Sequence, residues 1–127
     1  MDRKPKILLI DDDIDFAQAT SKVLESKPWE VSLAINGEEG LQKARKEKPD
    51  LVLLDIMMPV KDGFLVAEQF GKDPLLSKIP VLALTSFSDS SGQPFPFEVS
   101  EYIRKPIRPK ELLAKVEKHL RKTDSQA

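Results

Sequence analysis

The sequence contains no cysteine, which excludes disulfide bonds and thiolate metal sites. It also lacks an excess of either charge: 20 lysine and arginine residues stand against 21 aspartate and glutamate residues, and the formal net charge is -1. A nucleic-acid-binding domain usually carries a strong positive field. No apolar run is long enough for a membrane span or a signal peptide. We therefore expect a cytoplasmic protein with neither a nucleic-acid nor a membrane partner.

Length and composition favour one globular domain. The chain has 127 residues, 40% of them hydrophobic and 32% charged, which suits a single buried core. No stretch resembles a linker between two domains. We expect one domain over residues 1–127, with its core at about 5–121 and a short tail at 122–127.

Short apolar runs without polar alternation predict strands that are buried on both faces of a parallel sheet. They occupy residues 7–10, 51–54, 81–84 and, more briefly, 102–103, and a further strand is expected over 30–35. Helical patterns lie between and after them, at 16–27, 38–47, 63–70 and from 109 onward. The alternation of strand and helix predicts an α/β fold with right-handed crossovers and a doubly wound parallel sheet.

Each of the four apolar runs is followed at once by a polar group. Asp11 and Asp12 follow the first run, Asp55 the second, Thr85 the third, and Lys105 comes soon after the last. The carboxyl ends of parallel strands meet at one edge of the sheet, where ligands bind in open α/β folds. Asp55 alone would favour a helix cap or a turn hydrogen bond, but four such strand ends together predict a functional site.

Crowded carboxylates repel one another unless a cation neutralises them. Because few protein oxygens are available here, water and phosphate would have to complete the shell, which favours magnesium over calcium. The acidic run from Asp11 to Asp15 lacks the glycine and the closing glutamate of a calcium loop. Asp13 and Asp15 are therefore expected to cap the first helix or to lie in solvent.

Several segments together resemble the receiver domain of two-component response regulators. They are Asp11-Asp12 after a strand, the sequence Leu-Asp-Ile-Met-Met-Pro-x-x-Asp-Gly around Asp55, Thr85, Tyr102-x-x-Lys105-Pro106, and residues 34–41. The resemblance covers nearly the whole chain. It implies a flavodoxin-like, five-stranded parallel sheet in the order 2-1-3-4-5.

The resemblance also implies roles for the acidic residues. Asp55 would be the phosphoacceptor nucleophile, forming an acyl phosphate. Asp12, Asp55 and the backbone carbonyl of Met57 would ligate Mg²⁺, and Asp11 would act mainly through water. The phosphoryl donor would be a histidine kinase, a phosphotransfer protein or a small acyl phosphate, because the single histidine, His119, provides no internal relay.

The same resemblance assigns Lys105 to the charge of the transferring phosphoryl group, with a cis peptide bond to Pro106. Thr85 would contact the new phosphoryl oxygens, and Tyr102 would swing into the vacated space as part of a switch. We take His119 to be solvated near the negative end of the last helix.

Three classes of function are considered. The first is a stand-alone, single-domain receiver, a signalling phosphoacceptor rather than an enzyme, which switches binding to an unknown downstream protein. The second is a pseudo-receiver that acts as a constitutive protein-binding module. The third is an aspartate-nucleophile phosphatase, but Met57 stands where that class has its general acid. The sequence supports flavin binding even less, because no Ser/Thr/Gly-rich phosphate loop follows the first strand.

The sequence departs from the receiver pattern between residues 86 and 100. Gly92, Pro94 and Pro96 oppose a regular helix, since one interior proline costs about 3 kcal/mol. We expect the fourth helix to be absent, shortened or irregular, with one or both of Phe95 and Phe97 filling the core space rather than forming an exposed partner motif. The resemblance also places Met57 and Phe87 beside the path of the hydrolytic water, and since both are bulky and apolar it implies slow hydrolysis of the acyl phosphate.

Overall fold

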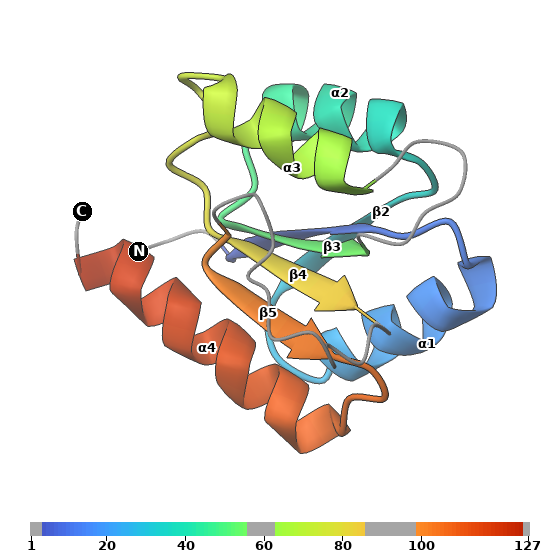
Figure 1. The fold of residues 1–127 in the computed structure, drawn as a ribbon. Coiled ribbons are helices and arrows are strands. Elements are labelled where there is room, and N and C mark those ends of the chain that lie inside the picture. The colour runs from blue at the N-terminus through green and yellow to red at the C-terminus, as the bar shows by residue number, and fades with distance from the viewer. Residues whose placement is uncertain (1–3, 56–62, 86–98, 126–127) are drawn as a thin grey trace, which may run out of the picture.

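The computed structural model describes residues 4–55, 63–85 and 99–125 of the chain. Five strands and four helices lie in these residues (Figure 1): β1 (Lys6–Ile10), α1 (Ile14–Leu24), β2 (Glu30–Ala34), α2 (Gly37–Glu47), β3 (Leu51–Asp55), α3 (Gly63–Lys72), β4 (Val81–Thr85), β5 (Glu101–Arg104) and α4 (Pro109–Ser125). None of these four helices is both long and apolar enough to cross a membrane.

The strands form one parallel sheet in the order β2-β1-β3-β4-β5, which confirms the predicted fold class and strand order. The register pairs Ile10 of β1 with Leu54 of β3. It also pairs Thr85 of β4 with Arg104 of β5. The carboxyl ends of four neighbouring strands therefore lie at one edge of the sheet.

Both faces of the sheet are covered by helices. Figure 1 shows α2 and α3 on one face and α1 and α4 on the other. Along β1, Leu8 and Ile10 pack into the core beneath α2 and α3, whereas Ile7 and Leu9 pack into the core shared with α1 and α4. Every residue of β3 is buried, which explains the absence of polar alternation in its sequence.

The helix starts follow local capping chemistry. The side chain of Asp13 accepts a hydrogen bond from the Phe16 N–H at 3.1 Å and begins α1, as expected. Asn36 caps α2 by accepting from the Glu39 N–H at 2.8 Å. The Glu39 carboxylate in turn accepts from the Ile35 N–H at 2.7 Å. These reciprocal bonds fix the entry of the chain into α2.

The first helix ends earlier than its apolar spacing predicts. It stops at Leu24 rather than at Lys27. Beyond it, the N–H groups of Ser26 and Lys27 donate to carbonyls three residues back, which is the tighter 3₁₀ pattern. Pro28 disfavours a helical conformation at the preceding residue, so the chain leaves the helix before it.

The expectation of a solvated His119 is wrong. His119 is buried on α4, and its Nε2 lies 3.0 Å from Glu101 Oε1, while Lys115 also forms an ion pair with Glu101. With 3.6 residues per turn, position 119 follows Leu112 and Val116 along the inward stripe of the helix. The cluster joins α4 to the amino end of β5, far along the sheet from the acidic strand ends.

The edge strand β2 has one exposed side, because it pairs only with β1. The carbonyl of Ala34 accepts from the Asp11 N–H, so the carbonyl of Leu33 faces away from β1. The Lys43 ammonium of α2 donates a hydrogen bond to this Leu33 carbonyl at 2.6 Å. A helix side chain therefore occupies an acceptor on the open edge.

The expected change in the fourth helix, between residues 86 and 100, lies almost entirely outside the described residues. The expectations for Phe87, Phe95 and Phe97 lie outside them as well. Of that interval the structure describes Val99, which packs against the core beneath α2 and α3, and Ser100, whose N–H donates to the Val81 carbonyl.

Candidate functional site

Asp11 and Asp55 are placed side by side by the sheet. Asp55 is the last residue of β3, and Asp11 directly follows β1, whose Ile10 pairs with Leu54. The alternation of strand residues directs both carboxylates toward the side of α1 and α4. Both residues are buried, with 0% of Asp11 and 5% of Asp55 exposed.

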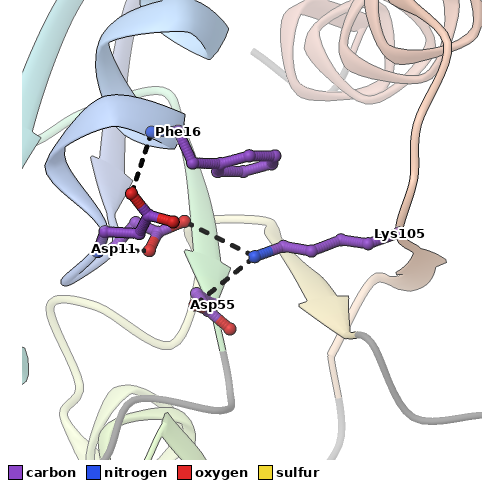
Figure 2. Close-up of polar contacts among 5 residues, drawn as sticks. Asp11, Phe16, Asp55 and Lys105 are labelled. Atoms are coloured by element: carbon purple, nitrogen blue, oxygen red, sulfur yellow. Dashed lines mark hydrogen bonds and ion pairs between the residues drawn. The ribbon is translucent and has the colours of Figure 1, made fainter.

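Asp12 completes a cluster of three carboxylates. Asp11, Asp12 and Asp55 each have one carboxylate oxygen that lies within 4.8 Å of such an oxygen in the other two residues. The Lys105 Nζ lies 3.5 Å from Asp55 Oδ2 and 3.7 Å from Asp11 Oδ2 (Figure 2). Among the residues that the structure describes, three carboxylates thus face one ammonium, so negative charge is in excess within this group.

Asp11 carries the clearest sign of an uncompensated charge. Its Oδ1 accepts from the Asp13 N–H at 2.9 Å, but its buried Oδ2 has no hydrogen-bond partner among the described residues. Burial raises the pKa of Asp11 to about 6; the Asp55 carboxylate adds to this rise, whereas the Asp13 N–H and Lys105 oppose it. A buried carboxylate oxygen without a donor fits a bound cation.

The donor set fits magnesium, which prefers oxygen ligands and binds through a few carboxylates while keeping several waters. The structure brings together the predicted ligands Asp11, Asp12 and Asp55. The predicted backbone ligand at Met57 lies outside the described residues. The acidic pocket is therefore consistent with the magnesium and phosphoacceptor site of a receiver.

Lys105 is positioned by the end of the sheet. Its backbone N–H donates to the Thr85 carbonyl at 2.8 Å, one residue beyond the pairing of Thr85 with Arg104. The peptide bond between Lys105 and Pro106 is cis, as the resemblance implies. The side chain is 20% exposed and reaches back across β4 toward Asp55.

Sequence reasoning missed one neighbour of the site, Phe16. The Lys105 Nζ lies 4.1 Å from the centroid of the Phe16 ring. The periodicity of α1 indicated only that Phe16 faces inward, and the structure shows it half-buried against the core of α1 and α4. The sequence did contain a signal for this neighbour, because Phe16 is the only aromatic residue in the first turn after Asp12.

Thr85 and Tyr102 lie toward the other face of the sheet. Thr85 is buried at the end of β4, and Tyr102 is half-buried against the core beneath α2 and α3. The register pairs Tyr102 with Ala83, so the alternation places Thr85 and Tyr102 on the same face. Burial raises the pKa of Tyr102 above its usual value. Their roles in a switch stay predictions.

Comparison with known proteins gives relatives of one kind. Residues 7–117 match the response regulator receiver domain family. The chain is 38% identical over 122 residues to the DNA-binding dual master transcriptional regulator RpaA of Synechocystis sp. (strain ATCC 27184 / PCC 6803 / Kazusa), covering 94% of this chain and 51% of RpaA. It thus spans about half the length of the curated relatives it matches.

Solved structures agree with this match. The chain is similar to a response regulator receiver domain protein from Methanospirillum hungatei JF-1, with a TM-score of 0.86 and 27% identity over 98% of this chain and 100% of that one. It is also similar to the chemotaxis response regulator CheY4 of Vibrio cholerae, with a TM-score of 0.83 and 28% identity over 92% and 99% of the two chains. Fold, acidic pocket and family match agree, and the chain belongs to the response regulator receiver domain family.

Proposed function

We propose that this chain is a phosphorylatable receiver that accepts a phosphoryl group on Asp55 in a magnesium-dependent reaction and thereby switches binding to a downstream protein. One observation carries the proposal: the carboxylates of Asp11, Asp12 and Asp55 converge within 4.8 Å, with the Lys105 ammonium 3.5 Å from Asp55. Membership of the receiver family implies a histidine kinase as donor. A phosphotransfer protein would present the same phosphohistidine chemistry.

Asp55 is the nucleophile in this proposal. One of its carboxylate oxygens forms a bond to phosphorus while the bond from phosphorus to the donor's leaving group breaks, and the leaving group keeps the electron pair. Asp11 is less suited to attack, because its Oδ1 accepts the Asp13 N–H and its pKa is raised by burial. Asp11 and Asp12 instead serve as ligands.

Phosphoryl transfer depends mainly on positioning and on neutralising the charge of the phosphoryl oxygens. Magnesium held by Asp11, Asp12 and Asp55, with the Met57 carbonyl that the resemblance adds, would supply positive charge to these oxygens. Lys105 provides an ammonium on the side of Asp55 that faces β5. The side chain reaches across β4, so its ammonium would lie beside a phosphoryl group on Asp55.

The output side of the proposal involves Thr85 and Tyr102. The Thr85 hydroxyl would bond to a phosphoryl oxygen, and Tyr102 on the same face of the sheet would follow the displaced chain. Thr85→Ala should leave phosphorylation in place and abolish the change in Tyr102 fluorescence on phosphorylation.

We also propose that the 1–127 domain has neither a nucleic-acid nor a membrane partner and that it lies in the cytoplasm. In this proposal the domain phosphorylates itself stoichiometrically and loses the phosphoryl group slowly, rather than turning over a substrate as an enzyme does.

The decisive experiment is intact mass after incubation with acetyl phosphate, with and without Mg²⁺. We expect a gain of one phosphoryl group that needs Mg²⁺ and is lost in Asp55→Asn. Asp15→Asn is the matched control, because Asp15 is an exposed carboxylate in the first turn of α1. No gain in a folded wild-type protein would contradict the proposal and favour a pseudo-receiver. Release of phosphate in excess of the chain, with no phosphorylated chain accumulating, would instead indicate a phosphatase.

A further inference from the structure

The ring of Phe16 lies against the ammonium of Lys105 at the acidic site. Figure 2 shows Phe16 entering from α1 and Lys105 from beyond β5, with Asp11 and Asp55 on the other side of the ammonium. The 4.1 Å between Lys105 Nζ and the ring centroid is well inside the roughly 6 Å limit of a cation–π contact.

The carboxylates alone hold Lys105 loosely. Its Nζ is 3.5 Å from Asp55 and 3.7 Å from Asp11, whereas a charge-assisted hydrogen bond is about 2.7–2.9 Å long. A lysine stem is flexible and its ammonium can be hydrated in many positions. The aromatic face adds a third contact that limits where the ammonium of this 20% exposed side chain can lie.

The backbone that carries the ring is fixed at the start of α1. Phe16 lies in the first turn of α1, and its N–H donates to the Asp13 carboxylate at 3.1 Å. The Asp13 N–H in turn donates to Asp11 Oδ1 at 2.9 Å. The same turn of chain therefore places both the ring and the carboxylate of Asp11, so the ammonium lies between groups with a common anchor.

We propose that Phe16 is a positioning residue, which holds the Lys105 ammonium beside Asp55 so that it meets the incoming phosphoryl group. The proposal rests on the function proposed above and adds a residue to it. Phe16 acts through Lys105 by narrowing the positions of the ammonium before the donor arrives.

The kinetic test compares Phe16→Leu with Phe16→Tyr, using acetyl phosphate at saturating Mg²⁺ so that no protein donor has to dock. Leucine keeps an apolar side chain but removes the aromatic face, and we expect phosphorylation to slow by about threefold to tenfold. Tyrosine keeps the face and should restore most of the rate. Val23→Ala, which loosens packing elsewhere on α1, should leave the rate near that of the wild type.

A double-mutant cycle separates positioning from packing. In a Lys105→Met background the change from Phe16 to Leu should have no further effect on the rate, because no ammonium remains to be positioned. An equal loss in both backgrounds would overturn the inference and assign Phe16 to the packing of α1. Equal rates for wild type and Phe16→Leu would overturn it as well.

A second readout does not depend on phosphorylation. In the NMR spectrum, the Lys105 Cε protons should be shifted upfield by the ring, and the shift should disappear in Phe16→Leu and persist in Phe16→Tyr. Absence of the shift in the wild type would overturn the inference even if Asp55 is phosphorylated. If the shift is present but no phosphoryl group is gained, the proposed function fails while the contact stands, so the two failures are distinguishable.

Discussion

Asp13 shows how one exposed residue serves both a helix and the acidic site. Its side chain caps α1 by accepting from the Phe16 N–H, and its own N–H donates to the carboxylate of Asp11. The first role belongs to the side chain and the second to the backbone. Substitution can therefore separate them.

Replacing Asp13 by alanine should lower the free energy of unfolding by about 1 kcal/mol, because the first turn of α1 loses its cap. Asp13→Asn should stay close to the wild type, since asparagine caps equally well. Urea denaturation measures the stability of both variants. Asp15→Ala, two residues further along the chain, is the control, because it removes an exposed carboxylate without removing the cap. An asparagine variant as unstable as the alanine variant would show that charge, rather than capping, is responsible.

At the scale of elements, α2 packs unusually close to β1. A Cβ added at Gly40 would lie 2.4 Å from Ile10 Cδ1 and 2.8 Å from Ile10 Cγ1. Ile10 is fully buried and cannot move aside freely. In α3, by contrast, a Cβ at Gly71 would meet nothing within 4 Å among the described residues.

These two glycines make a matched pair. Gly40→Ala should destabilise the protein by about 1–3 kcal/mol through overpacking, partly offset by the better helix propensity of alanine. Gly71→Ala should stabilise it by about 0.5–1 kcal/mol, because only the propensity changes. Chemical denaturation of both variants measures the difference. If both substitutions stabilised the protein, the contact between α2 and β1 would have to be looser than described.

The elements also show what sequence can predict. Unbroken apolar runs identified the strands, because burial on both faces removes polar alternation, and the strand ends then placed Asp11, Asp55 and Lys105 at one edge. Helix ends were less predictable, since the end of α1 depends on local 3₁₀ bonds near Pro28. The helical period already indicated an inward position for His119, but its pairing with Glu101 could not be foreseen, because Glu101 is brought near only by the packing of α4 on β5.

At the scale of the whole molecule, two ionisable groups make the stability of the protein depend on pH in opposite directions. The pKa of Asp11 is raised to about 6 from an ordinary 3.8, mainly by burial. The pKa of Glu101 is lowered, first by its hydrogen bond with Lys115 and then by that with His119. The folded state thus binds an extra proton at Asp11 and resists one at Glu101.

The metal-free protein should therefore be more stable near pH 5 than at pH 7. Between about 4 and 6 the folded state holds a proton on Asp11 that the unfolded state has lost, so stability falls as pH rises, by on the order of 2 kcal/mol in all. The stabilisation that comes from the lowered pKa of Glu101 is present above the ordinary pKa of 4.5, and it is lost as the pH falls below that value. Melting temperatures in EDTA from pH 4 to 8 measure the profile.

Two comparisons assign this profile to the acidic pocket. Asp11→Asn should flatten the decline toward pH 7, because the buried charge is removed. Mg²⁺ at pH 7 should raise the melting temperature of the wild type by binding the folded state, and should do so less in the variant. If the decline in stability toward pH 7 persists unchanged in Asp11→Asn, it must come from another ionisable group.

The contact between Lys43 and the Leu33 carbonyl has a consequence for the molecule in concentrated solution. An edge strand with free acceptors can template pairing with a strand of another chain and so start aggregation. The ammonium occupies one such acceptor and adds a charge that a foreign strand would have to desolvate. This occupied acceptor thus disfavours pairing of β2 with a strand of another copy of the chain.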